Sequence, residues 1–167
     1  MIASLDVAYS GASAYAAGLT FREWTDANAL EERRVPLSNV QQYEPGQFFR
    51  RELPCLLAVL KVLPTADVIL IDGYVWLGDG NKPGLGAHLY KSLSERTPVI
   101  GVAKTKFKGA DSAAEVLRGR STRPLFITAA GMSQECAAAH IRSMQGLYRI
   151  PTLLKRVDSL CRNTHIV

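Results

Sequence analysis

Residues 66–72, with the sequence Ala-Asp-Val-Ile-Leu-Ile-Asp, precede Gly73 and contain four consecutive large apolar residues. A short apolar run bounded by polar residues predicts a strand buried on both faces, as in a sheet covered by helices. Asp72 then closes this strand at its carboxyl end. Because a charged carboxylate is costly to bury, Asp72 is either a solvated strand end or part of a functional site.

Two groups of segments precede this strand. A helix is expected over about residues 47–62, where leucines recur at helical spacing. Proline is tolerated in the first turn of a helix, so Pro54 indicates that residues 49–53 are the helix start or lie just before it. Three segments nearer the amino end have the composition of strands and predict an antiparallel meander: residues 2–8, 14–22 and 29–35.

The segments after residue 73 alternate between helix and strand. Ser133 has the character of a helix start, with Glu135 soon after it. This alternation predicts one α/β domain whose later strands are parallel, with helices on both sides of a mixed sheet. The expected helices are residues 87–96, 133–144 and 153–160, and the expected strands are residues 98–103 and 124–128.

Composition favours a globular protein without cofactor motifs. The 167 residues are 47% hydrophobic and carry no repeat or linker, so we expect a single domain over residues 1–167. Three widely spaced cysteines without a CxxC pair indicate neither a disulfide framework nor a zinc site and suit a reducing cytoplasm. No apolar run approaches the roughly 20 residues of a membrane span, and the first residues do not resemble a signal peptide. The formal charge of +5 favours a polyanionic partner only weakly.

Four acidic residues stand where a carboxylate is unusual. Asp6 interrupts an apolar strand, so it either faces water on an edge strand or is paired, hydrogen-bonded or bound to a metal. Glu52 lies near a helix start, and Asp158 falls in the last helix. If the strands of Asp6 and Asp72 are neighbours, their like charges would raise one pKa unless a divalent cation lies between them. Oxygen ligands suit Mg²⁺ or Mn²⁺, which support phosphodiester hydrolysis.

Five segments resemble those of the endonuclease V family in order and approximate spacing. They are Asp6-Val7-Ala8-Tyr9, residues 43–52, residues 68–73, residues 84–89 and residues 98–104. The resemblance extends from Ile2 to about Leu160 and implies a ribonuclease H-like fold. It also implies a magnesium-dependent endonuclease of DNA repair that cuts on the 3′ side of deoxyinosine, or of inosine in RNA. We therefore expect a cytoplasmic monomer whose partner is DNA, with RNA as a second candidate, and no membrane.

The resemblance carries functional roles onto individual positions. Tyr43 matches the wedge tyrosine that fills the gap left by a base turned out of the stack. At the carboxyl end, an ungapped alignment places Asp158 in the metal site, whereas an alternative register would place Arg156 there. The implied catalytic residues are Asp6, Glu52, Asp72 and Lys104. The implied metal ligands are Asp6, Asp72, Glu52 and Asp158. The implied nucleic-acid contacts are Tyr43, Pro45, Gly46, Gly73, Tyr74, Lys82 and Lys106.

The loop after Asp72 departs from the family pattern. Where the family has Gly-His-Gly and then His-Pro-Arg-Arg, residues 73–83 are one residue longer and contain no histidine. Since this region lines the base pocket of the family, selectivity for hypoxanthine is open. Tyr74 and Trp76 offer alternative stacking surfaces or simple packing. The alternatives are a nuclease with another lesion specificity, or a nucleic-acid-binding member with weak or lost catalysis.

Other polar residues allow a structural reading beside a functional one. Arg118, Arg120 and Arg123 form a basic loop that either grips phosphates or is a solvated surface. Residues 104–108 combine three lysines with an aromatic residue, which favours phosphate contact. His88 is interpreted as a structural residue of its helix or as a residue that supports the site through its neighbours.

Overall fold

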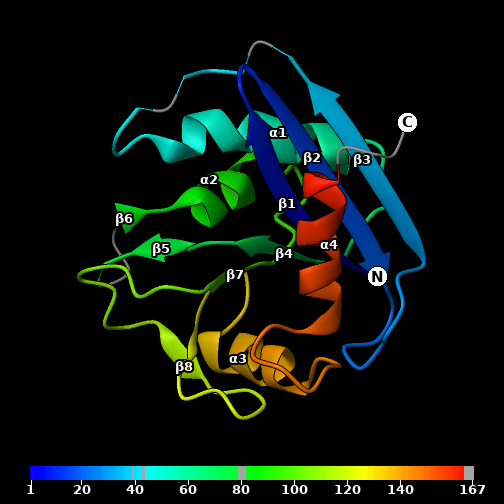
Figure 1. The fold of residues 1–167 in the computed structure, drawn as a ribbon. Coiled ribbons are helices and arrows are strands. Elements are labelled where there is room, and N and C mark those ends of the chain that lie inside the picture. The colour runs from blue at the N-terminus through cyan, green and yellow to red at the C-terminus, as the bar shows by residue number, and fades with distance from the viewer. Residues whose placement is uncertain (39, 43, 79–81, 164–167) are drawn as a thin grey trace.

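The computed structural model describes residues 1–38, 40–42, 44–78 and 82–163. Across these residues, seven strands form one mixed sheet in the order β3-β2-β1-β4-β7-β9-β8 (Figure 1). The strands are β1 (Ile2–Ser10), β2 (Ser13–Phe21), β3 (Glu31–Leu37), β4 (Val68–Asp72), β7 (Val99–Ala103), β8 (Ala114–Val116) and β9 (Leu125–Ala130).

The amino-terminal meander is confirmed. Strands β1 and β2 pair antiparallel from Ile2↔Phe21 to Ser10↔Ser13, and β3 pairs antiparallel with β2. The pairing leaves a two-residue turn in which Gly11 has a φ of 60°. A positive φ at this position matches the twist of a tight hairpin and is accessible to glycine at little cost. The tight turn at Gly11 therefore sets the register of β1 against β2.

The predicted strand at residues 66–72 is also confirmed, as β4. It pairs parallel with β1 on one side and with β7 on the other. Its side chains alternate between two cores, since Leu70 belongs to one buried cluster whereas Ile69 and Ile71 belong to the other. A strand in the middle of a covered sheet needs apolar residues on both faces, which explains the unbroken run.

The prediction that the later strands are parallel is correct for β4 and β7 and wrong for β9. Strand β9 runs antiparallel to β7, and β8 pairs antiparallel with β9. A parallel neighbour requires a crossover connection, usually a helix. Residues 104–124 form loops and the short β8 instead, so the chain returns along β9 in the opposite direction.

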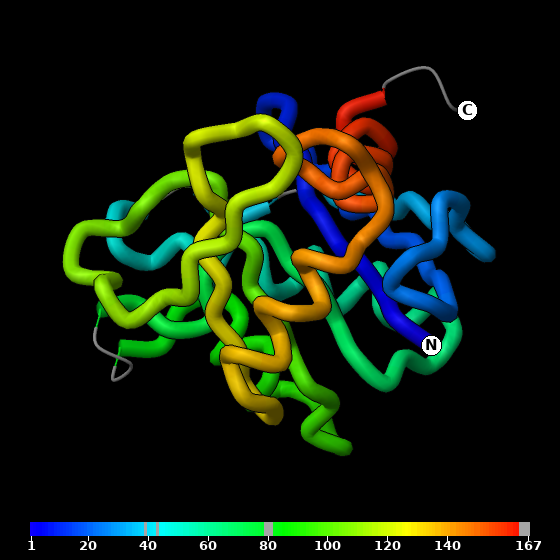
Figure 2. Tube along the Cα trace, turned by 90° about the horizontal axis from the view of Figure 1, so that it is seen from below, coloured from blue at the N-terminus to red at the C-terminus, as the bar shows by residue number. Residues whose placement is uncertain are grey.

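Helices cover both faces of the sheet (Figures 1 and 2). Helices α1 (Phe48–Leu60) and α2 (Leu85–Ser92) pack on the face with Leu5 and Ile71. Helices α3 (Gln134–Ser143) and α4 (Thr152–Arg162) pack on the face with Leu70. Ser133 caps α3 as predicted, because its side chain accepts a hydrogen bond from the Cys136 N–H at 3.1 Å. None of the helices in the described ranges has the length and apolar character of a membrane span.

Pro54 lies inside α1, so the expectation that it marks the first turn was wrong. The helix begins at Phe48, which puts Pro54 in the second turn. Proline has no N–H for the Arg50 carbonyl. Both Pro54 and Arg50 are exposed, so water can bond that carbonyl. Glu52, only two residues earlier, lies on the buried face of the same helix.

Candidate active site

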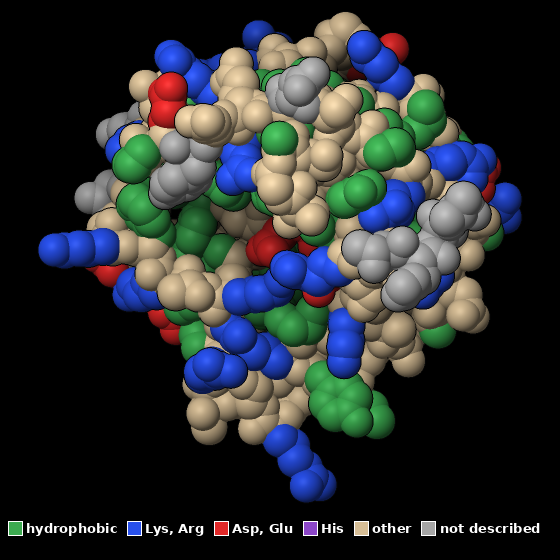
Figure 3. All heavy atoms as spheres, turned by 45° about the horizontal axis from the view of Figure 1, so that its top comes forward, with side chains coloured by type: hydrophobic (Ala, Val, Ile, Leu, Met, Phe, Trp, Pro, Cys, Tyr) green, Lys and Arg blue, Asp and Glu red, His purple; other side chains and the backbone are tan. Residues whose placement is uncertain are grey.

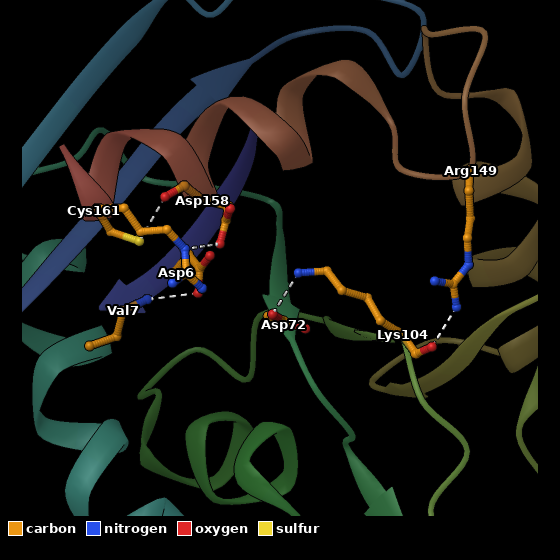
Figure 4. Close-up of polar contacts among 8 residues, drawn as sticks. Asp6, Val7, Asp72, Lys104, Arg149, Asp158 and Cys161 are labelled. Carbon is orange, nitrogen blue, oxygen red and sulfur yellow. Dashed lines mark hydrogen bonds and ion pairs between the residues drawn. The ribbon is translucent and has the colours of Figure 1, made fainter. Parts of the chain in front are cut away.

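Asp6 and Asp72 lie at the same edge of two neighbouring parallel strands. Leu5 of β1 pairs with Ile71 of β4, so the next residue of each strand, Asp6 and Asp72, lies beside the other. Asp6 is 7% exposed, and its Oδ1 accepts a hydrogen bond from the Val7 N–H at 2.8 Å. Lys104, directly after β7, donates from Nζ to Asp72 Oδ2 at 3.0 Å. Three adjacent strands therefore place two carboxylates and one ammonium together (Figure 4).

Glu52 approaches this pair from α1. Its side chain is buried, and burial together with the charges of Asp6 and Asp72 raises its pKa to about 8. Burial and the charge of Asp72 likewise raise the pKa of Asp6 to about 7. Each carboxyl group is thus disfavoured as an anion by its neighbours and by the lack of water.

Helix α4 adds Asp158 and Cys161 to the cluster. The carboxylate oxygens of Asp6 and Asp158 and the Cys161 sulfur lie within 4.8 Å of one another. Partial burial opposes ionisation of Asp158, but a hydrogen bond from Arg162 at 2.8 Å holds its pKa below the ordinary value. The alternative residue, Arg156, is paired with Glu32 at 2.7 Å. The structure therefore brings Asp158 beside Asp6.

The donor set suits a hard divalent cation. Asp6, Glu52, Asp72 and Asp158 offer carboxylate oxygens, and two of these groups are nearly inaccessible to water. A cation of charge +2 would offset both the mutual repulsion and the cost of burial. The Cys161 thiol is a softer donor, and burial raises its pKa to about 12, which disfavours the thiolate that metals bind.

A cavity of about 530 Å³ opens beside Asp72. Four predicted nucleic-acid contacts line it, namely Gly46, Gly73, Tyr74 and Lys82. The Tyr74 hydroxyl donates to the Thr105 carbonyl at 2.9 Å and accepts from the Phe107 N–H at 3.0 Å, which fixes its ring as a wall. In Figure 3 an apolar hollow lies next to acidic side chains, with lysine and arginine side chains nearby.

Three predicted contacts lie elsewhere or outside the described residues. Pro45 is exposed in the turn before α1, in which the Gln47 N–H bonds the Glu44 carbonyl at 3.0 Å. Lys106 forms an ion pair with Asp111 at 3.0 Å. Tyr43 lies outside the described part of the chain.

Several residues at the site were not identified from the sequence. His88 stacks on Phe49 with ring centroids 3.6 Å apart, and both rings line the cavity beside Asp72. Ile150 lines the space next to Asp6 and Asp72. Cys161 stands three residues after Asp158 on a helix, a spacing that places two side chains on one face and so could have indicated it.

Both interpretations of Arg118, as a phosphate contact and as a solvated surface residue, are wrong. Its side chain is 6% exposed, and its guanidinium bonds backbone carbonyls of the segment that joins α3 to α4. Arg120 and Arg123 of the same loop are exposed. The residues after it, Gly-Arg-Ser-Thr-Arg, have the composition of a surface loop and do not indicate that Arg118 is buried.

Solved structures of similar proteins share this fold. The endonuclease V of Streptomyces avermitilis is 26% identical, with a TM-score of 0.75 over 96% of this chain and 79% of that one. The catalytic domain of human endonuclease V is 25% identical, with the same TM-score over 96% of this chain and 80% of that one. The ribonuclease H-like fold expected from the sequence is thereby confirmed.

Sequence comparisons agree. The endonuclease V of S. avermitilis is 32% identical over 158 residues, and that of Streptomyces coelicolor is 31% identical over 143 residues. The aligned regions cover 82% and 72% of this chain but only 65% and 59% of those relatives. A family model described as Endonuclease V matches residues 1–150, which include Asp6, Glu52, Asp72 and Lys104 and end before Asp158. The chain belongs to the endonuclease V family.

Proposed function

We propose that this chain is a metal-dependent endonuclease that hydrolyses a phosphodiester bond on the 3′ side of deoxyinosine or another altered base. The observation that carries the proposal is that Asp6 and Asp72 come directly after the last paired residues of the parallel strands β1 and β4, Leu5 and Ile71, with Asp158 beside Asp6. Family membership supports the same chemistry. The aligned region spans only part of the length of these relatives, so the activity and the substrate of this chain are both part of the proposal.

The residues of the site have distinct proposed roles. Asp6 and Asp72 hold the cation, and Glu52 and Asp158 complete its shell or orient the attacking water. When bound, Mg²⁺, or Mn²⁺ as a second candidate, supplies Lewis acidity toward a phosphate oxygen. The proposed role of Lys104 is to stabilise negative charge on the scissile phosphate, and its Nζ, 3.0 Å from Asp72 Oδ2, supports this role.

The cavity beside Asp72 is proposed to receive the altered base. Its aromatic walls suit a flat ring turned out of the stack, and it adjoins one of the proposed metal ligands. Gly46 lines this cavity, and Tyr43, Pro45 and Gly46, which precede α1 in the sequence, are proposed to contact the strand. A Ciona intestinalis endonuclease V of the same fold has been crystallised with DNA that contains an inosine followed by a ribo-adenosine. We propose that this chain binds DNA, with RNA as a second candidate, and that it acts as a monomer of one domain.

Another lesion specificity is the second candidate function. Tyr74 belongs to the loop that departs from the family pattern after Asp72, and two hydrogen bonds fix its ring in the wall of the cavity. A rigid pocket with altered walls favours a base whose shape fits those walls.

The test measures nicking of end-labelled strands that contain one deoxyinosine, inosine or other altered base, with Mg²⁺, Mn²⁺ or a chelator. We expect metal-dependent nicking that Asp6→Asn abolishes. The matched control is Asp67→Asn, because Asp67 comes just before β4, at the opposite end of that strand from Asp72, and is highly exposed beside the amino terminus. If the parent binds these strands with strong salt dependence yet never cuts them, the chain is a binding protein and the endonuclease proposal fails.

A further inference from the structure

Leu147 and Tyr148 are the two most exposed large hydrophobic residues in the described part of the chain. Leu147 is 85% exposed and Tyr148 is 76% exposed. They are adjacent in the segment that connects α3 to α4. Two neighbouring apolar side chains that are almost fully in water cost solvation free energy, so their exposure calls for an explanation in binding. We name this pair the 147–148 ledge.

The ledge is held rigidly from beneath by a buried arginine. Arg118 is 6% exposed, and its guanidinium donates to the carbonyl of Tyr148 at 2.9 Å, of Arg149 at 3.4 Å and of Gly146 at 3.2 Å, and also to that of Met144. Gly119, next to Arg118, has a φ of 60° and leaves no room for a Cβ beside the Leu147 carbonyl. A surface held this firmly is preorganised, which lowers the entropic cost of binding.

The same segment borders the candidate active site. Ile150, two residues after Tyr148, lines the space beside Asp6, Asp72 and Lys104. The Arg149 guanidinium donates to the backbone carbonyl of Lys104 and to that of Pro124 at 2.8 Å. The ledge is therefore tied to the strand end that carries the proposed catalytic lysine.

Unpaired positive charge surrounds the ledge. Arg149 donates to the Arg123 carbonyl at 3.0 Å, and burial and the charge of Arg123 lower the pKa of Arg149. Arg120 and Arg123 are exposed. Among the described residues, no ion pair includes any of these three arginines. An aromatic ring among unpaired arginines matches the chemistry of a nucleic-acid strand, with bases for the ring and phosphates for the guanidinium groups.

We propose that the 147–148 ledge is a second stacking surface for the substrate, on which Tyr148 holds a base next to the cleaved bond while Arg123 and Arg149 contact phosphates. The ledge lies on the segment before α4, whereas the wedge at Tyr43 precedes α1. The inference rests on the proposed function, since it assigns a further contact to the same substrate.

The test measures binding of a labelled deoxyinosine strand in chelator, so that cutting does not interfere. Tyr148→Ala is expected to weaken binding about fivefold or more, whereas Tyr148→Phe keeps parental affinity because the ring is retained. Tyr148→Ala leaves the salt dependence unchanged, and Arg123→Ala reduces its slope by about one. Leu30→Ala is the matched control, because Leu30 is 50% exposed beside Thr20, which pairs with Ala3 toward the other end of β1.

Stacking has its own spectroscopic readout. Tyr148→Trp is expected to show fluorescence quenching by the bound strand beyond that of the parent, which a purely structural role of the residue would not produce. Melting temperatures of all variants should stay within about 1 °C of the parent because the substituted side chains are exposed.

The outcomes separate the two proposals. If the parent binds and cuts the strand while Tyr148→Ala binds equally well, the ledge is overturned and the proposed function stands. Equal weakening by Tyr148→Ala and Leu30→Ala overturns the ledge as well. If the parent neither binds nor cuts any strand offered, both proposals fail together.

Discussion

Arg118 gives a sharp test of how the fold supports the site. The side chain donates to four backbone carbonyls of residues 144–149 and has no described anionic partner. Burial lowers its pKa, which indicates that water has been lost around the charge. We predict that Arg118→Met unfolds more readily than the parent because it leaves these carbonyls without a donor.

The magnitude follows from opposing contributions. A buried acceptor left without a partner costs roughly 1–3 kcal/mol. Some of the four carbonyls can turn toward water, and removing the guanidinium also removes its desolvation cost. A net loss of about 3 kcal/mol is therefore expected, which lowers Tm by about 6–12 °C for a chain of this size.

Urea unfolding and thermal melting measure this loss, with Arg120→Met as the control because Arg120 is exposed two residues away. Arg118→Lys should recover less than half of the loss, since one ammonium cannot reach carbonyls that a planar fork spans. The control should stay within about 0.5 kcal/mol of the parent. If Arg118→Met melts with the parent, the buried guanidinium does not hold the 147–148 ledge and the reasoning is refuted.

Three further predictions concern other parts of the fold. Asp6→Asn should stabilise the metal-free protein by at most about 4 kcal/mol, because the pKa of about 7 shows that the Asp6 anion is disfavoured in the fold. The same variant should abolish any rise of Tm with Mg²⁺, and a loss of stability without metal would contradict the prediction. Gly101→Ala should cost about 1–3 kcal/mol and reduce nicking, because a Cβ would lie 2.5 Å from the Gly73 carbonyl after the β4 strand; parental urea unfolding would contradict it. The hydrogen bond and charge of Arg156 lower the pKa of Glu32 below its ordinary value of 4.5. The ion pair therefore stabilises the fold at pH values above 4.5, and this stability is lost as the pH falls through the lowered pKa. Glu32→Gln should therefore destabilise by at most about 1 kcal/mol at pH 7, and the difference from the parent should shrink as the pH is lowered below 4.5, which melting across this pH range checks.

Local patterns predicted the elements whose environment is set by their own residues. The apolar run of β4 indicates burial on both faces. Ser133 indicates the start of α3 because its side chain caps the helix. The direction of β9 was not predictable in this way, because a buried strand has the same composition in either orientation. Only the missing helix between residues 104 and 124 distinguished the two.

The candidate site divides along the same line. Asp6 and Asp72 were conspicuous because each breaks an apolar pattern, and sheet pairing then brought them together. Arg118 was misread because burial of a charged side chain depends on carbonyls supplied by a segment about 26–31 residues further along the chain. No local pattern carries that information.

The candidate site lowers the stability of the metal-free protein, and the rest of the fold must offset this loss. Burial and repulsion disfavour the anions of Asp6 and Glu52, so a metal-free site subtracts from stability, whereas the central strands β1, β4 and β7 are covered by two apolar cores. Asp6 lies within β1 and Asp72 ends β4, so both carboxylates are carried by strands that have apolar cores on either side. The loop after Asp72, which departs from the family pattern, lines the cavity, so a substitution there alters the cavity wall without changing the central strands. Chemistry and selectivity are thereby separated in space, and selectivity can diverge at little cost to the chemistry.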